Sequence, residues 1–177
     1  MNGHRNGDWI TTFSGRKIWP CDPLAEEIHI EDIAHHLSLL CRFAGACRVH
    51  YSVAQHSTLC SRIVPPEDAR IALLHDGSEA FLHDIARPIK PYLSNYQSLE
   101  NAMMEQIAIR FNLPWPMPPS IHHADNVLVI TERRDLLNPG PEWGEWTKGI
   151  KPLKDKIVPL SPAEAEREFL ARYEELF

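Results

Sequence analysis

The sequence lacks several features that would each have indicated a common class of protein. Its cysteines form no Cys-x-x-Cys pair, so nothing supports a zinc knuckle. No dense block of lysine and arginine occurs and the formal net charge is −6, which argues against a cationic face for duplex nucleic acid. No apolar run reaches the length of a membrane span, and no secretory signal precedes the first predicted element.

These absences predict a reduced, cytoplasmic protein that binds neither duplex nucleic acid nor a membrane. Its four cysteines are then expected to be free thiols: Cys21, Cys41, Cys47 and Cys60. The rest of the composition is ordinary, with 177 residues of which 44% are hydrophobic and 24% charged, enough for one domain with a substantial core. Histidine is the unusual component, because ten of them direct attention to metal chemistry.

Hydrophobic periodicity predicts an all-α fold, a compact bundle of about six helices with a small N-terminal β-hairpin. Two β-favouring runs flank a Ser-Gly turn within residues 9–19 and predict the hairpin. Ser52 with Gln55, and Ser161 with Glu164, have the spacing of capping boxes at helix N-termini. The predicted helices cover residues 31–43, 53–63, 67–82, 95–111, 121–136 and 161–177.

We therefore expect residues 1–177 to form a single domain in four parts. These are the hairpin at 9–19, a helical core at 28–136, a long loop at 138–160 and a C-terminal helix at 161–177. The loop is rich in proline, glycine and tryptophan and has no periodicity, with a short strand considered at Lys156-Ile157-Val158. Loops of this length are often functional.

A histidine and an aspartate stand side by side behind two leucines, as His75 and Asp76. Burying an imidazole and a carboxylate in an apolar run is costly unless something pairs them, and a divalent metal ion does so. His56 and Asp125 lie within neighbouring predicted helices, so three helices could direct four ligands inward. Water on such a metal is acidified and supplies a nucleophilic hydroxide. The sequence thus predicts a hydrolytic metal site.

Four further charged residues are candidates for the chemistry around that site. Glu79 is placed one helical turn after Asp76, where it could orient or deprotonate the attacking water. Arg42 and Lys90 could hold phosphate oxygens, and Asp84 could meet a substrate hydroxyl. Their ordinary alternative is solvated surface charge. The five tryptophans could stack a base, but packing of the hairpin and the long loop is the simpler interpretation.

The same residues resemble the HD-domain metal-dependent phosphohydrolases. The match is closest to the compact 5′-deoxynucleotidases (the YfbR-like group), and the phage dATP triphosphohydrolases of the DatZ type are similar relatives. It covers roughly residues 28–136 and, more loosely, the final helix, and the family pattern often has tryptophan where Phe43 stands. Four motifs carry the resemblance in the family's order: Arg42-Phe43-Ala44-Gly45, Tyr51 to Ser57, Leu74 to Ala80, and Asp84 to Lys90.

The resemblance implies roles for these residues. One divalent ion (Mn, Co, Zn or Mg) would be held by His56, His75, Asp76 and Asp125. Glu79 would serve the attacking water and Asp84 would approach the sugar, as the catalytic pair. Substrate contacts would come from Arg42, Phe43, Lys90 and Asp84.

The implied substrate is a deoxynucleoside 5′-phosphate. A monophosphate would be cleaved to deoxynucleoside and phosphate, and a triphosphate such as dATP to deoxynucleoside and triphosphate. The family also implies a homo-oligomer. Two alternatives remain open: hydrolysis of another phosphoester, such as (p)ppGpp or a cyclic dinucleotide, and a non-catalytic nucleotide-sensing protein.

Overall fold

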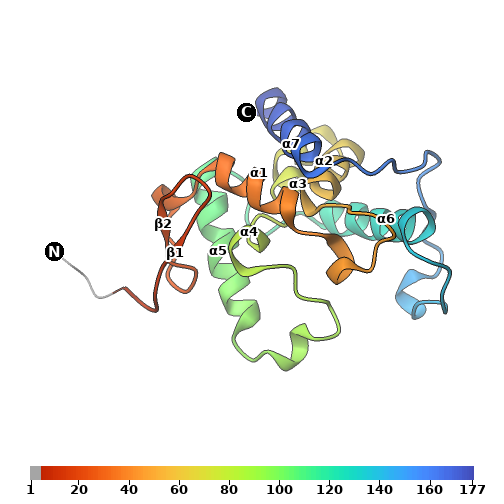
Figure 1. Ribbon diagram of the computed structural model, residues 1–177, viewed down its shortest axis with the longest axis horizontal. Coiled ribbons are helices and arrows are strands. Elements are labelled where there is room, and N and C mark those ends of the chain that lie inside the picture. Colours follow the sequence, from red (N-terminus) through yellow and green to blue (C-terminus); the bar gives the residue numbers. More distant parts are fainter. Residues whose placement is uncertain (1–4) are drawn as a thin grey trace.

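The computed structural model describes residues 5–177, so residues 1–4 of the predicted domain lie outside it (Figure 1). Across the described range the chain is mostly helical, with one small antiparallel hairpin near the N-terminus. Its strands are β1 (Ile10–Thr11) and β2 (Lys17–Ile18), with Ile10 opposite Ile18. The predicted all-α fold with an N-terminal hairpin is therefore confirmed.

The α-helices of the described range are α1 (Ile30–Leu39), α2 (Val53–Ile63), α3 (Ala69–Leu73), α4 (Glu79–Leu82), α5 (Tyr96–Phe111), α6 (Pro119–Leu136) and α7 (Pro162–Leu176). Short 3₁₀ helices separate them: η1 (Ala25–Glu27), η2 (Arg42–Gly45), η3 (Pro66–Asp68), η4 (Lys90–Tyr92) and η5 (Glu145–Thr147).

The main core lies where α7 packs across α1 and α2 (Figure 1). Phe169 of α7 is fully buried there, among side chains that include Ile33 and Leu37 of α1. A capping box starts α7 as predicted, because Ser161 and Glu164 each accept a hydrogen bond from the other's backbone N–H. The C-terminal helix therefore covers α2, the helix that carries the candidate ligand His56.

The continuous helix predicted over residues 67–82 is wrong in its middle. It is interrupted between α3 and α4, where the N–H of Gly77 donates to the Leu74 carbonyl at 2.9 Å in a tight turn. A Cβ atom at Gly77 would lie 2.9 Å from that carbonyl oxygen and 3.1 Å from Cδ1 of Ile107 on α5. Glycine thus permits the close approach, and His75 and Asp76 lie in this turn instead of sharing a helical face with Glu79.

The helix predicted over 31–43 ends earlier, at Leu39. The chain then turns, and the N–H of Arg42 donates to the carbonyl of Tyr51 at 2.9 Å. Phe43 and Ala44 have positive φ angles of 55° and 50°, a region that residues other than glycine rarely adopt. Arg42 is therefore placed by a strained loop, a feature that often marks functional sites, and not by a helix C-terminus.

The long loop after α6 forms no strand at 156–158 within the described chain, and side chains hold it in place instead. Gln55 of α2 donates from Nε2 to the carbonyl of Val158 at 2.8 Å and accepts the N–H of Leu160 at 3.0 Å. Ser52 caps α2 as predicted, accepting the N–H of Gln55 at 3.1 Å. The capping box itself is not completed, because the Gln55 side chain clamps the loop.

All four cysteines are free thiols, as predicted, and Cys60 is buried in a small second core. None of the helices described between residues 5 and 177 is both long and apolar enough to cross a membrane.

Candidate metal centre

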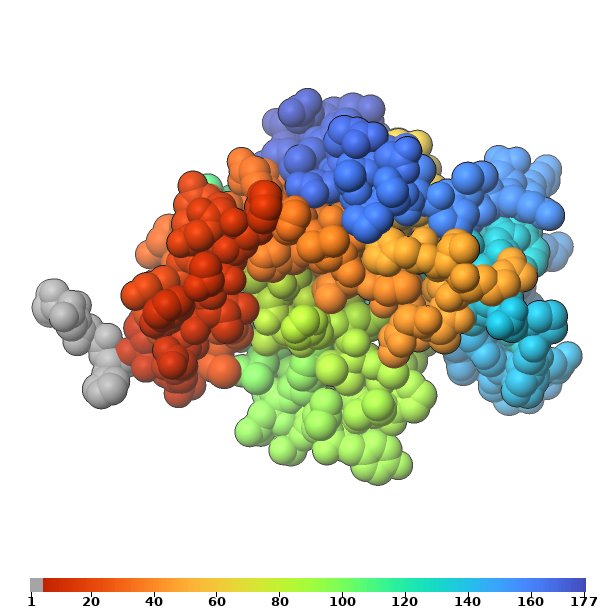
Figure 2. Space-filling model, in the orientation of Figure 1, coloured from red at the N-terminus to blue at the C-terminus, as the bar shows by residue number. Residues whose placement is uncertain are grey.

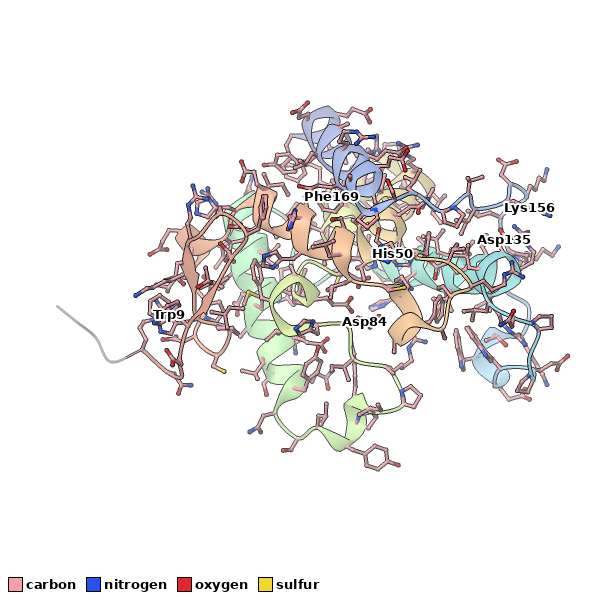
Figure 3. The ribbon with its side chains drawn as sticks, viewed as in Figure 1. Trp9, His50, Asp84, Asp135, Lys156 and Phe169 are labelled. Carbon is pink, nitrogen blue, oxygen red and sulfur yellow. The ribbon has the colours of Figure 1, made fainter. Side chains whose placement is uncertain are left out.

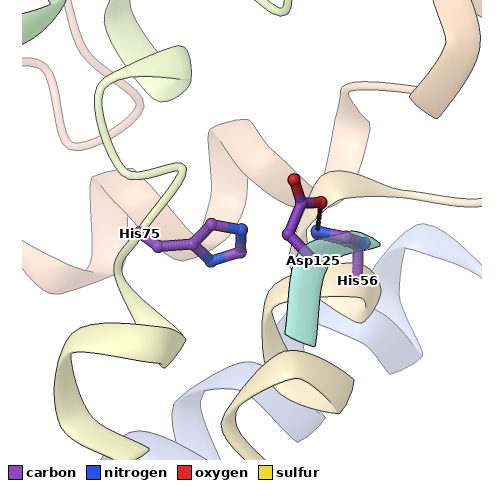
Figure 4. Close-up of side chains that lie close together, drawn as sticks. All are labelled: His56, His75 and Asp125. Atoms are coloured by element: carbon purple, nitrogen blue, oxygen red, sulfur yellow. Dashed lines mark ion pairs between the residues drawn. The ribbon is translucent and has the colours of Figure 1, made fainter. Parts of the chain in front are cut away.

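The four predicted ligands converge from α2, α6 and the turn between α3 and α4. Figure 4 shows His56, His75 and Asp125 among them. Nε2 of His56 lies 3.3 Å from Oδ1 of Asp125 and 3.7 Å from Oδ2 of Asp76. Nε2 of His75 lies 3.3 Å from the same Asp76 oxygen. One ligand atom from each of His56, His75 and Asp125 lies within 4.8 Å of the other two. These three residues could hold a metal ion, with Asp76 beside them.

Burial without partners supports this assignment. Nε2 of His56, Nε2 of His75 and Oδ2 of Asp76 are each buried and accept or donate no hydrogen bond among the residues described. Leaving a buried polar atom unpaired costs about 1–3 kcal/mol, so three such atoms in one place require a compensating partner. Imidazole and carboxylate ligands together fit a divalent transition metal, and the residues present therefore suit the ion that the sequence predicts.

The tautomers of both histidines are set by groups behind them. Nδ1 of His75 lies 2.8 Å from the carbonyl oxygen of Ala72, which can only accept, so this nitrogen carries the proton. Nδ1 of His56 lies 2.5 Å from Oε1 of Glu132, an ionised carboxylate oxygen that can only accept, so this nitrogen also carries a proton. In the neutral imidazole that binds a metal, each arrangement leaves the lone pair on Nε2, directed toward the shared space, as metal-binding histidines require.

Glu132 is a central residue that the sequence interpretation missed. It is fully buried on α6 and accepts hydrogen bonds from the Tyr51 hydroxyl at 3.0 Å and from Nη2 of Arg42 at 3.2 Å, besides that of His56. Burial raises the pKa of Glu132, but Arg42 and His56 outweigh it and lower that pKa to about 2. The one sequence signal was spacing, because Glu132 follows Asp125 by two helical turns on the same face.

Arg42 is a buried cation at the centre of the acidic groups. Its guanidinium lies 3.5 Å from Asp76, 3.8 Å from Asp125 and 3.2 Å from Glu132. Burial lowers the pKa of Arg42, but the nearby carboxylates of Glu132, Asp76 and Asp125 raise it by more than burial lowers it. The pKa is therefore above its ordinary value, and the side chain remains charged. The arginine is thereby held in a fixed direction beside the candidate ligands.

A cavity of about 480 Å³ opens beside the centre. Asp76 and Asp125 line it, and so do all five of the other predicted site residues: Arg42, Phe43, Glu79, Asp84 and Lys90. Asp84 lies on the segment that follows α4 (Figure 3). In Figure 2 this yellow-green segment and the blue loop after α6 border a hollow beneath the orange segment that contains Arg42.

Two acids of the cavity, Glu79 and Asp84, and its lysine, Lys90, have shifted pKa values. Burial raises the pKa of Glu79 well above its ordinary value, Asp76 and Asp84 raise it further, and Oε2 of Glu79 has no partner in the described chain. Burial also raises the pKa of Asp84. Lys90 donates to Glu100 at 2.7 Å, and this carboxylate outweighs the lowering effect of burial on the lysine pKa. Lys90 is thus a cation that is already paired.

Two tryptophans of the long loop also line the cavity, where the simpler interpretation had expected only packing. The rings of Trp143 and Trp146 stack with centroids 6.2 Å apart and planes at 27°. Phe43 lies 6.0 Å from Trp143. No periodicity identified these residues, and the signal in the sequence was the density of tryptophan in one loop.

Comparison with known proteins gives relatives without a stated activity. The chain is 39% identical over 170 residues to the "Uncharacterized protein YfdR" of Escherichia coli K12, an alignment that covers 95% of each protein. It is 34% identical over 126 residues to the "Uncharacterized protein RCAP_rcc00048" of Rhodobacter capsulatus, covering 66% of this chain and 64% of that protein. No protein-family model matches the chain. Function must therefore be argued from the site.

Proposed function

Because the chain belongs to the same family as YfdR of Escherichia coli, which supplies no activity, we propose a function from its own residues: metal-dependent hydrolysis of deoxynucleoside 5′-phosphates. The observation that carries this proposal is a group of three buried ligand atoms beside the cavity, on His56, His75 and Asp76, that have no hydrogen-bond partner among residues 5–177. Arg42 and Lys90 line that cavity and suit the anionic phosphate of such a substrate.

His56, His75, Asp76 and Asp125 would hold one divalent ion, of the Mn, Co, Zn or Mg class. When bound, such an ion supplies Lewis acidity that polarises a phosphoryl group and lowers the pKa of water at the site. Glu132 and the Ala72 carbonyl fix the two histidines in the tautomer that this binding needs.

The chain's own residues then bind the phosphate and move the proton. Arg42 presents a planar, preoriented guanidinium, because Glu132 already holds one side of it. Lys90 lies at the cavity wall and, although it is paired with Glu100, its ammonium has further N–H donors for a phosphate oxygen. Glu79 takes the proton of the attacking water, and it is a stronger base than an exposed carboxylate because burial raises its pKa.

The substrate class in the proposal comes from the resemblance to HD-domain phosphohydrolases. The four motifs contain the ligands His56, His75 and Asp76, the base Glu79, and the cavity residues Arg42, Phe43, Asp84 and Lys90. The fourth proposed ligand, Asp125, follows them on α6. A monophosphate would give deoxynucleoside and phosphate, and a triphosphate such as dATP would give deoxynucleoside and triphosphate. Both reactions place the same sugar and α-phosphate at the site.

Phosphate and triphosphate release over a panel of nucleotides tests the proposal, with purified protein loaded with Mn or Co. We expect His75→Ala to abolish bound metal and turnover while helical circular dichroism persists. His123→Ala is the matched control, since His123 is an exposed histidine on α6. If the loaded protein cleaved only (p)ppGpp or cyclic dinucleotides, the substrate class would be wrong. If it cleaved no phosphoester at all, a nucleotide-sensing role would replace the enzyme.

Two further parts of the proposal concern the whole molecule. We propose a homo-oligomer, supported by the family resemblance and by Tyr92, whose side chain is 87% exposed beside the exposed Ile89 and Leu93. Light scattering coupled to gel filtration measures this. We also propose a cytoplasmic location, because four free thiols suit a reducing compartment. Cell fractionation measures it.

A further inference from the structure

Three aromatic side chains form one wall of the cavity, which we call the aromatic wall: Phe43, Trp143 and Trp146. Adjacent rings lie 6.0 and 6.2 Å apart, and the two indoles are inclined by only 27°. Trp146 is 44% exposed although it lines the cavity. A nearly parallel pair of indoles suits the stacking of a planar ligand.

The aromatic wall is fixed to the helix that carries Asp125. The guanidinium carbon of Arg133, on α6, lies 5.1 Å over the ring of Trp143. The same arginine donates to the carbonyl of Pro141 at 2.7 Å, which ties down the start of the loop. The wall is therefore positioned relative to the metal centre by α6 itself.

Arg87 shows that a planar group can occupy the face of Trp146. Its guanidinium carbon lies 4.9 Å from the centre of that ring, and its Nη2 lies 3.6 Å from Oδ2 of Asp125. With one C–N bond between those two atoms, the ring centre is at most about 10 Å from the carboxylate oxygen. One sugar and one phosphate can bridge that distance between a stacked base and the metal centre.

The remaining uncharged lining has no hydrogen-bonding side chain among the residues described. It consists of Ala44, Ile85, Ala86, Pro88, Val129 and Gly144. A pocket of this kind recognises a ring by area and shape, and it discriminates between similar ligands by only about 10- to 200-fold. A larger ring system gains more from such a wall than a smaller one.

We infer that the aromatic wall is the nucleobase subsite of this protein and that it selects purine over pyrimidine deoxynucleotides by stacking, chiefly on Trp143 and Trp146. The inference rests on the proposed function, because it names which substrates the same site prefers. It assigns to the loop after α6 a role in specificity that the metal centre does not provide.

Calorimetric binding to the Mn-loaded protein tests the subsite separately from turnover. The probes are non-hydrolysable phosphonate analogues of dAMP, of dCMP and of base-free 2-deoxyribose 5-phosphate. The wild type should bind the purine analogue about 10-fold more tightly than the pyrimidine analogue. Trp146→Ala should weaken purine binding by about 10-fold or more and leave the base-free analogue unchanged. Trp146→Phe should restore most of the loss.

Trp9→Ala is the matched control. Trp9 is 40% exposed, close to the exposure of Trp146, but it lies beside the hairpin, far from Asp84 and the cavity (Figure 3). It should leave the binding of all three probes unchanged, and Trp143→Ala should act like Trp146→Ala.

Three results would overturn the inference. If the alanine variants bound the base-free analogue as much more weakly as the purine analogue, the tryptophans would have only a structural role. Unchanged purine binding in both alanine variants would remove the subsite while leaving the phosphohydrolase proposal intact. Failure of the wild type to bind any of the three probes would remove the proposed function, and the subsite with it.

Discussion

His56 donates its Nδ1 proton to Glu132 across 2.5 Å, and both side chains are fully buried. The pair joins α2 to α6 and directs Nε2 of His56 toward Asp76 and Asp125. Glu132 also compensates Arg42, so one carboxylate fixes both a candidate ligand and the candidate phosphate-binding cation. The first prediction follows from this double role.

Glu132→Gln keeps the shape of the side chain and removes its charge. We expect metal affinity to fall about 10- to 100-fold, as it does when such supporting partners are lost. Unfolding free energy should fall by about 3 kcal/mol, because Arg42 loses a buried partner. Metal titration by calorimetry and urea unfolding measure the two effects. The exposed Glu142, changed to glutamine, is the control, and an unchanged metal affinity in Glu132→Gln would contradict the assigned role.

Metal binding should depend on pH through His56. Burial and Arg42 lower the pKa of His56, but Glu132 and Asp125 raise it more, to about 10 in the metal-free protein, from an ordinary 6.5. His56 is therefore protonated at neutral pH, and binding should release about one proton, so apparent affinity should rise with pH. Calorimetry in buffers of different ionisation enthalpy counts the proton. Binding with no proton released at pH 7 would contradict this.

The same shift has a consequence for the stability of the metal-free protein. The pKa of His56 is higher in the folded than in the unfolded protein, so protonation of His56 stabilises the fold. This contribution to the free energy of unfolding is fully present below pH 6.5 and is lost as the pH rises toward 10. Urea unfolding of metal-free protein across this range measures it. Stability that rose through the range would contradict the shift, and adding metal should flatten or reverse the decline.

Glu79→Gln should separate catalysis from metal binding. Metal content should be retained, because Glu79 is not among the proposed ligands, while turnover should fall by about 10²- to 10⁴-fold. The acidic limb of the pH–rate profile should disappear as well, because this limb reports the raised pKa of Glu79. Glu105→Gln on the exposed face of α5 is the control. Wild-type turnover in Glu79→Gln would exclude it as the base.

Gly77→Ala tests the turn that carries His75 and Asp76. The added methyl group would meet the Leu74 carbonyl at 2.9 Å and Cδ1 of Ile107 at 3.1 Å, so the turn must shift. We expect a loss of about 1–3 kcal/mol in unfolding free energy, with weaker metal binding. Gly140→Ala is the control, since the nearest atom to its added carbon is 3.9 Å away. Equal stability of the two variants would show that the turn adapts freely.

The helical fold was predictable because it rests on local signals. Apolar periodicity identified α2, α5, α6 and α7 nearly to their ends, and Ser161 with Glu164 marked the start of α7. The break between α3 and α4 was not predictable in the same way, since it depends on Ile107 packing against Gly77 from thirty residues away. Contacts across the chain leave no period in the sequence.

In the candidate site, too, residues with a local signal in the sequence were predictable and residues placed by long-range contacts were not. The ligands were recognisable because histidine and aspartate are unusual within apolar segments, and the structure brings His56, His75 and Asp125 together. Glu132 was missed, and the two cavity tryptophans were assigned to packing, because charged and aromatic side chains are ordinary on helices and in loops. Their place in the site is evident only from the fold, in which Glu132 contacts Tyr51 and Arg42. Trp143 likewise lies beside Phe43 only in the folded chain.

The clamp at Gln55 has a consequence for how the protein is made. Gln55 bonds to Leu160, 105 positions later, and the neighbouring His56 bonds to Glu132, 76 positions later. During synthesis α2 emerges long before Glu132 and Leu160, so these contacts of α2 cannot form until most of the chain has been made. A metal ion that met the nascent chain early would find the histidines without Asp125 or Glu132. In the proposed site, tight metal binding would therefore require that translation has passed α6.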